Sequence, residues 1–244
     1  MKTNVRYSII KNTVSALSLV AILAVCESAA QAQPAWLGGN NQADSSGGVV
    51  VDKDAFRKSS DEVVGKVLAA RIKFLDAKAK LMEALGLKTD SVTKASEALR
   101  AKEGSTSSKD ILKGIDESKK TTAEADQQFT DSLAQSQELS AESKVKYAEG
   151  TGKFIEGVLL EKDQIEKIQK LVEQGQSLAK SASILEKPKM LGLVKPVKTL
   201  STMVPGDVKE GTLTLGKIMK FAKKENITSI PNADKAAASL GSLE

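Results

Sequence analysis

Apolar side chains recur at helical spacing through most of the chain after residue 53. From Asp54 to Leu87, residues three, four and seven positions apart are apolar, and such residues share one face of an α-helix. The remaining helix surface carries charged residues, mostly Lys66, Lys73, Lys78, Lys80 and Glu83. This segment therefore predicts an amphipathic helix that Gly86 ends. The apolar stripe consists of Leu68, Ile72, Leu75, Ala79 and Met82.

Further helical patterns continue to residue 187. A short helix is expected from about Ser91 to Lys102, followed by a turn at residues 104–108. Residues 109–149 have helical propensity but few large apolar side chains, which suits either two closely packed antiparallel helices or a mostly exposed helix. The Gly-Thr-Gly sequence at residues 150–152 predicts a break or a kink. Beyond it, a clear stripe predicts a helix to about Glu186, through Phe154, Val158, Ile165, Ile168 and Val172.

Three prolines change the pattern after residue 187. Pro188, Pro196 and Pro205 are almost evenly spaced, and proline inside a helix removes one hydrogen bond and clashes with the preceding turn. We therefore expect helices that are short or kinked, and each proline suits the first turn of its own segment. The sequence from Asp207 to Glu210 resembles a capping box ahead of a helix that ends near Lys224, and a last helix is expected after residue 231.

Together these patterns predict an all-α protein. It is expected to be an elongated antiparallel helical bundle, with coiled-coil-like packing, or a long helical hairpin, with short proline-punctuated helices at the C-terminal end. The predicted divisions are a signal peptide at 1–32, a flexible leader at 33–53, a long-helix bundle at 54–187, and a short-helix segment at 188–244 that packs on the bundle.

The first 32 residues have the three-part layout of a secretory signal. Three basic residues precede an uncharged apolar run from Val14 to Val25, and Ala30-Gln31-Ala32 offers small residues for a signal peptidase. The apolar run is too short to cross a bilayer. We expect cleavage after Ala32 and a periplasmic or secreted protein. The alternatives are an uncleaved anchor helix and a lipid anchor on Cys26, which lies in a weak lipoprotein-like sequence.

Composition narrows the chemistry that this chain can perform. It contains no His, and its one Cys would be lost on cleavage, so His/Cys metal sites, imidazole catalysis and disulfides are not expected. Cleavage reduces the net charge from +5 to +3, because the first 32 residues carry three basic and one acidic side chain. Only three Arg remain, which together with export argues against a nucleic-acid partner.

The motifs that remain are weak, and we predict no catalytic residue, no cofactor, no metal and no enzymatic activity. Gly150-Thr151-Gly152-Lys153 lacks the first glycine of a phosphate-binding loop, and the pair Asp52 and Asp54 lacks the later ligands of a calcium loop. Ser-x-x-Lys pairs, the spacing of serine acyl-enzymes, occur as often as chance allows. These pairs are Ser91–Lys94, Ser143–Lys146 and Ser177–Lys180.

One amphipathic segment is a candidate contact surface for a membrane or a partner. Between Gly211 and Lys224, one helix face is apolar and the other is basic, as in helices that bind anionic lipid or acidic partners. Packing of the apolar face into the bundle is the interpretation that we favour. The residues of this surface are Leu215, Ile218 and Met219 on the apolar face and Lys217, Lys220, Lys223 and Lys224 on the basic side.

These features predict that the protein functions by binding other components through its helical surfaces. We expect an exported, non-enzymatic helical protein of the bacterial cell envelope that acts through helix-mediated protein–protein interaction or self-association. The alternative is a peripheral membrane or membrane-active protein that uses residues 188–225 on an anionic membrane surface.

Overall fold

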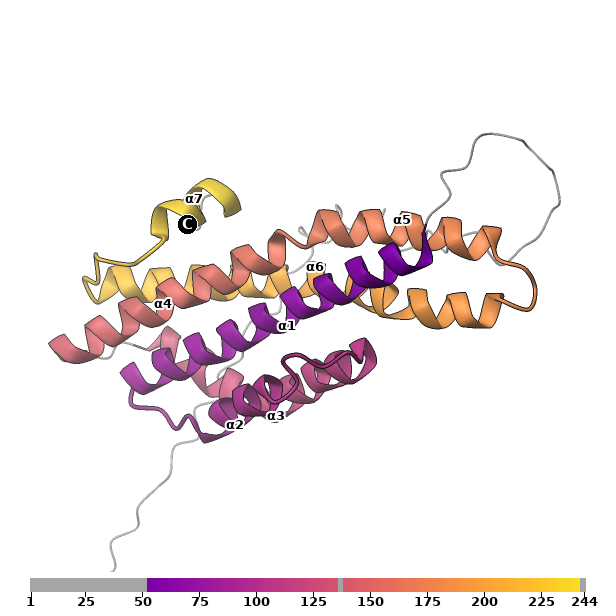
Figure 1. Ribbon diagram of the computed structural model, residues 1–244. Coiled ribbons are helices and arrows are strands. Elements are labelled where there is room, and N and C mark those ends of the chain that lie inside the picture. The colour runs from indigo at the N-terminus through magenta and orange to yellow at the C-terminus, as the bar shows by residue number, and fades with distance from the viewer. Residues whose placement is uncertain (1–51, 136–137, 242–244) are drawn as a thin grey trace, which may run out of the picture. The chain divides into compact units, whose positions relative to one another are not determined.

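The computed structural model describes residues 52–135 and 138–241. The predicted signal peptide, Cys26 and all but the last residues of the predicted leader lie outside these residues. Within them the chain is helical and has no β-strand, so the predicted all-α class is confirmed (Figure 1). The helices are α1 (Lys53–Ala84), α2 (Asp90–Arg100), α3 (Ser108–Ala134), α4 (Ala141–Lys162), α5 (Ile165–Ser181), α6 (Lys187–Lys224) and α7 (Ala233–Leu240).

Local sequence accounts for where several of these helices begin and end. The side chain of Asp52 accepts a hydrogen bond from the backbone N–H of Asp54 at 2.8 Å, which caps α1. Ser107 and Ser140 cap α3 and α4 in the same way. Gly86 follows α1 with φ of +69°, a conformation that glycine adopts without strain, and the predicted stop is confirmed.

Helix α1 is flanked on one side by α4 and α5 and on the other by α2 and α3 (Figure 1). Gly150 of α4 faces Leu81, Gly157 faces Phe74, and Gly175 of α5 lies close to Phe56. Since the position on α1 falls as the residue number rises, α4 and α5 together run antiparallel to α1. Gly150 and Gly157 are two helical turns apart and so share one face of α4, and all three glycines let the backbones approach α1 closely.

The predicted break at residues 150–152 is wrong, because α4 continues through it from Ala141 to Lys162. These glycines serve packing instead of a turn. A β-carbon at Gly150 would lie 2.9 Å from Cγ of Leu81, and one at Gly152 would lie 2.8 Å from Cβ of Pro231. The helix ends only at residues 163–164, where no glycine or proline marks the sequence.

The expectation of short helices divided by prolines is also corrected. Helix α6 runs without interruption through Pro196 and Pro205, and the predicted capping box at residues 207–210 lies inside it. Each internal proline leaves one carbonyl without its helical donor, on Gly192 and Ser201 respectively. Gly192 is exposed and Ser201 is half-buried, so water can bond both. The buried face of α6, which packs on four other helices, outweighs the remaining cost.

Two glycine substitutions are expected to change stability in opposite directions. Gly65 lies inside α1 with nothing within 4 Å of an added β-carbon, so Gly65→Ala should raise the free energy of unfolding by about 0.5–1 kcal/mol. Gly150→Ala should lower it by about 1–3 kcal/mol, because the α1 backbone at Leu81 cannot move away from the new methyl group. Urea unfolding followed by circular dichroism measures both, and shifts of the same sign would contradict the packing described here.

Candidate functional site

Charged side chains from α1, α3, α4 and α6 form an interior polar cluster. Lys119 of α3 lies 2.5 and 2.8 Å from the two carboxylate oxygens of Asp207 in α6. Lys78 of α1 pairs with Asp126 of α3, whose other oxygen accepts a hydrogen bond from Thr122 at 3.2 Å. These contacts join α3 to the two helices beside it. The members of the interior polar cluster are Arg71, Lys78, Lys119, Asp126, Glu161 and Asp207.

Glu161 is the unusual member of this cluster, because it is 1% exposed and its Oε2 has no hydrogen-bond partner among the described residues. Burial raises its pKa from an ordinary value of 4.5 to about 8, and Asp207 adds to the shift. Arg71 and Lys119 act in the opposite direction without overcoming burial. Glu161 is therefore neutral at pH 7. One turn later, Oε1 of the buried Gln164 is also unpartnered in the described part of the chain.

The interior polar cluster has no group arranged for nucleophilic chemistry. Burial lowers the pKa of Lys78, but the Asp126 carboxylate beside it opposes this shift and occupies its ammonium group. Arg71 donates to the hydroxyl of Ser118 at 3.4 Å, and that hydroxyl donates to the carbonyl of Ile115 at 2.7 Å. The other members bind neighbouring protein groups, while Oε2 of Glu161 stays unpartnered among the residues that the structure describes, so the cluster connects helices.

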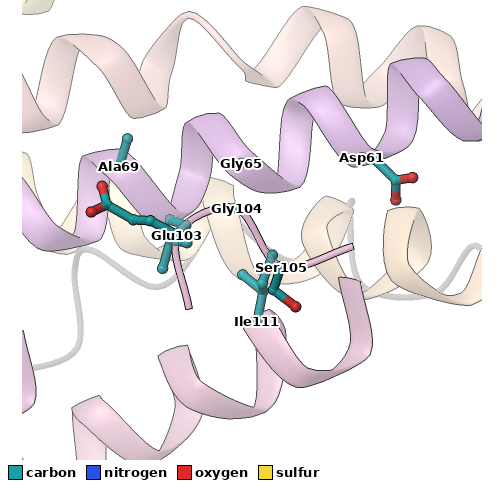
Figure 2. Close-up of a pocket in the computed structure, with 8 residues that line it drawn as sticks. Asp61, Gly65, Ala69, Glu103, Gly104, Ser105 and Ile111 are labelled. Atoms are coloured by element: carbon teal, nitrogen blue, oxygen red, sulfur yellow. The ribbon is translucent and has the colours of Figure 1, made fainter. Parts of the chain in front are cut away.

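A surface hollow of about 360 Å³ lies between α1 and the turn before α3 (Figure 2). Its acidic groups are Asp61 and Glu103, which do not point toward one another. Asp61 already accepts a hydrogen bond from the hydroxyl of Ser108 at 2.6 Å. Gly65 and Gly104 leave the space open without adding a polar side chain. The hollow thus lacks the converging polar groups of a ligand site.

The turn between α5 and α6 exposes large apolar side chains to water. We call residues 182–191 the α5–α6 tip. Ile184 and Leu185 are 84% and 89% exposed, the highest values for large apolar residues in the described ranges. The carboxylate of Glu186 lies 2.8 Å from the ammonium group of Lys53, so the tip is held beside the start of α1 (Figure 1). The α5–α6 tip combines an uncovered aliphatic pair with exposed lysines.

The amphipathic surface predicted from the sequence is divided by the fold. Leu215 and Ile218 are fully buried, and Met219 is half-buried. The hydroxyl of Tyr147 donates to the carbonyl of Ile218, which fixes this part of α6 against α4. The apolar face therefore belongs to the core, while the basic residues Lys217, Lys220, Lys223 and Lys224 remain exposed.

The α5–α6 tip was not predicted from the sequence, although the residues around Ile184 and Leu185 give an indication of it. Ile184 and Leu185 stand between Ser183 and the polar run Glu186-Lys187-Pro188, where a turn is expected to carry polar residues. Helical periodicity assigns the pair to the end of an apolar stripe. Only the fold shows that α5 ends at Ser181, before the pair can reach the core.

The weak motifs have structural roles in the fold. Lys146 binds the carboxylates of Glu83 and Glu142, and these hydrogen bonds raise its pKa, which favours the charged form over a base for Ser143. Thr151 lies inside α4 and donates to the carbonyl of Tyr147 at 2.8 Å, which excludes a phosphate-binding loop there. Asp52 caps α1.

Metal sites, membrane-spanning helices and similarity to known proteins are three further features that can indicate a biochemical class. The described residues contain no group of three or more side chains placed to hold a metal ion. None of their helices combines the length and apolar character that crossing a membrane requires. No family model matches the chain, and comparisons with curated proteins and with solved structures found no significant similarity.

Proposed function

We propose that this protein is an exported, non-enzymatic helical protein of the bacterial cell envelope that docks on another envelope component through its α5–α6 tip. The observation that carries the proposal is the exposure of Ile184 and Leu185. Each aliphatic side chain of this size gains about 1.5–3 kcal/mol when it leaves water. Two such side chains side by side are a local apolar patch that favours contact with a partner.

The helices behind the tip support this role because they hold it rigidly. Gly175 of α5 packs against Val194 of α6, where a β-carbon would lie 2.9 Å from Cγ1 of the valine. Met190, Val197 and Leu200 are buried along the same part of α6. A rigid support reduces the conformational entropy that the tip loses on docking, and so lowers the free-energy cost of binding.

Export and the envelope location are supported by the signal-like N-terminal sequence. Docking can take two forms, a helix-mediated contact with a protein partner or a second copy, and attachment to a membrane surface. In either form the protein acts by binding.

Docking at the tip predicts where the protein is found in the cells that produce it. The wild type should sediment with the envelope fraction after cell lysis, and Ile184→Ser/Leu185→Ser should move into the supernatant. Leu213→Ser is the matched control, because Leu213 is also an exposed aliphatic residue, at 62%, on a distant part of α6. Immunoblotting of the two fractions measures the shift. Equal distribution of all three proteins would refute docking through the tip.

A further inference from the structure

We infer that the α5–α6 tip binds an anionic lipid surface, with Ile184 and Leu185 inserted among the acyl chains and the neighbouring lysines at the level of the headgroups. This inference rests on the proposed function, since it uses the same tip, and it adds the chemistry of the partner. It overlaps the sequence-based membrane hypothesis for residues 188–225, but it places the inserted residues at Ile184 and Leu185, because Leu215 and Ile218 are buried.

The charge around the tip is complementary to such a surface. Lys180, Lys187, Lys189 and Lys195 are exposed, and within the described ranges none of them forms an ion pair. Glu186 is the one acidic residue between positions 174 and 206, and its carboxylate is paired with Lys53. The tip therefore presents an excess of positive charge, and each lysine near an anionic membrane raises affinity by about fivefold.

The same lysines alternate with apolar groups that remain in water. Lys187, Leu191 and Lys195 are four positions apart on α6 and so lie along one side of the helix. Leu191 is 45% exposed, so α6 adds a further uncovered aliphatic side chain six positions after Leu185. Lysine stems can lie along such a surface while their ammonium groups remain at the headgroups.

The size and shape of the tip favour lipid over a protein partner. Stable protein–protein interfaces bury roughly 1,200–2,000 Å² and usually centre on aromatic or Arg side chains. The tip offers two exposed aliphatic residues on the turn and a third, Leu191, in α6, and residues 182–191 contain no aromatic residue and no Arg. A bilayer needs no complementary pocket, so a small aliphatic point with surrounding lysines is sufficient.

Vesicle flotation of the exported protein tests this inference directly. The vesicles are phosphatidylethanolamine with phosphatidylglycerol, and phosphatidylcholine alone serves as the neutral surface. Ile184→Ser/Leu185→Ser removes the aliphatic pair, and Lys187→Gln/Lys189→Gln removes two charges. The matched controls are Leu213→Ser on the distant half of α6 and Lys88→Gln/Lys94→Gln at exposed positions near the end of α1 and in α2, which change the same residue types away from the tip. Circular dichroism and a thermal melt of each variant confirm that all of them fold.

The wild type should float with the anionic vesicles, and binding should weaken at high salt and on phosphatidylcholine. Each tip variant should lose about tenfold or more in affinity, whereas the controls should stay within about twofold. A wild type that stays unbound in the presence of anionic vesicles would overturn the inference, as would controls that lose as much as the tip variants. If vesicle binding fails but tip-dependent sedimentation with the envelope persists, the partner is a protein and the proposed function stands. If both fail, the proposed function fails as well.

Discussion

Because Glu161 is buried, the wild-type protein is expected to lose several kcal/mol of its free energy of unfolding as the pH rises from acidic to mildly alkaline values. Replacement of Glu161 by Gln should remove this loss. The wild-type carboxyl is 1% exposed and its pKa is raised to about 8 by burial, with a further contribution from Asp207. Arg71 of α1 and Lys119 of α3 are the facing cations, and they offset part of this shift. Glutamine has nearly the same shape and no titrating proton.

The sign follows from proton binding in the two states. Below pH 4.5 the carboxyl is neutral both folded and unfolded, so Glu161 carries no penalty. Between pH 4.5 and about 8 the unfolded chain releases the proton and the folded chain keeps it, so folding stability falls as the pH rises. Above about pH 8 the penalty is constant. Each unit of pKa difference corresponds to about 1.4 kcal/mol.

Urea unfolding of the wild type and Glu161→Gln across this pH range measures the difference directly. The free energy of unfolding of Glu161→Gln should rise steadily relative to that of the wild type from pH 4.5 to pH 8. Glu156→Gln on the same helix is the matched control, because a hydrogen bond from Lys73 at 2.7 Å lowers the pKa of Glu156. The Glu156 carboxylate stabilises the fold at pH values above the pKa that it has in the unfolded chain. The free energy of unfolding of Glu156→Gln should therefore fall furthest below that of the wild type at neutral pH. A Glu161→Gln difference that is independent of pH would contradict a buried neutral acid.

Truncation of Tyr147 is expected to lower the free energy of unfolding by about 3–5 kcal/mol. The side chain is fully buried, and its ring stacks on Phe221 with centroids 5.1 Å apart. Its hydroxyl donates to the carbonyl of Ile218 at 3.1 Å. Tyr147→Ala removes these contacts between α4 and α6 and leaves a cavity that the surrounding helices fill only in part.

Two further substitutions divide this effect into its parts. Tyr147→Phe keeps the ring and should cost about 0.5–1.5 kcal/mol, the contribution of one hydrogen bond. Val145→Ala, two positions earlier on α4 and 60% exposed, should change stability by less than about 0.5 kcal/mol. Equilibrium unfolding followed by circular dichroism compares the three variants. A Tyr147→Ala protein as stable as Val145→Ala would show that this part of the α4–α6 contact does not form in solution.

Much of the local structure could be predicted from the chain because it depends on neighbouring residues. The α1 stripe, the stop at Gly86 and the helix after residue 90 follow from periodicity and from glycine conformation. The same reasoning failed at residues 150–152 and at Pro196 and Pro205, where glycine and proline usually mark boundaries. There α4 and α6 continue because packing against other helices outweighs local preference.

The burial of the amphipathic surface predicted from the sequence also depends on contacts that are distant in the chain. Periodicity correctly placed Leu215 and Ile218 on one helix face, but a pattern cannot show whether water, lipid or another helix covers that face. Contacts with residues far away in the chain, such as Tyr147, place this face in the core. They also place Glu161 among charges from three other helices and leave Ile184 and Leu185 uncovered. Helix class and the absence of His from the chain are readable along the sequence, whereas burial, the pKa of Glu161 and the exposed tip arise from contacts between distant segments.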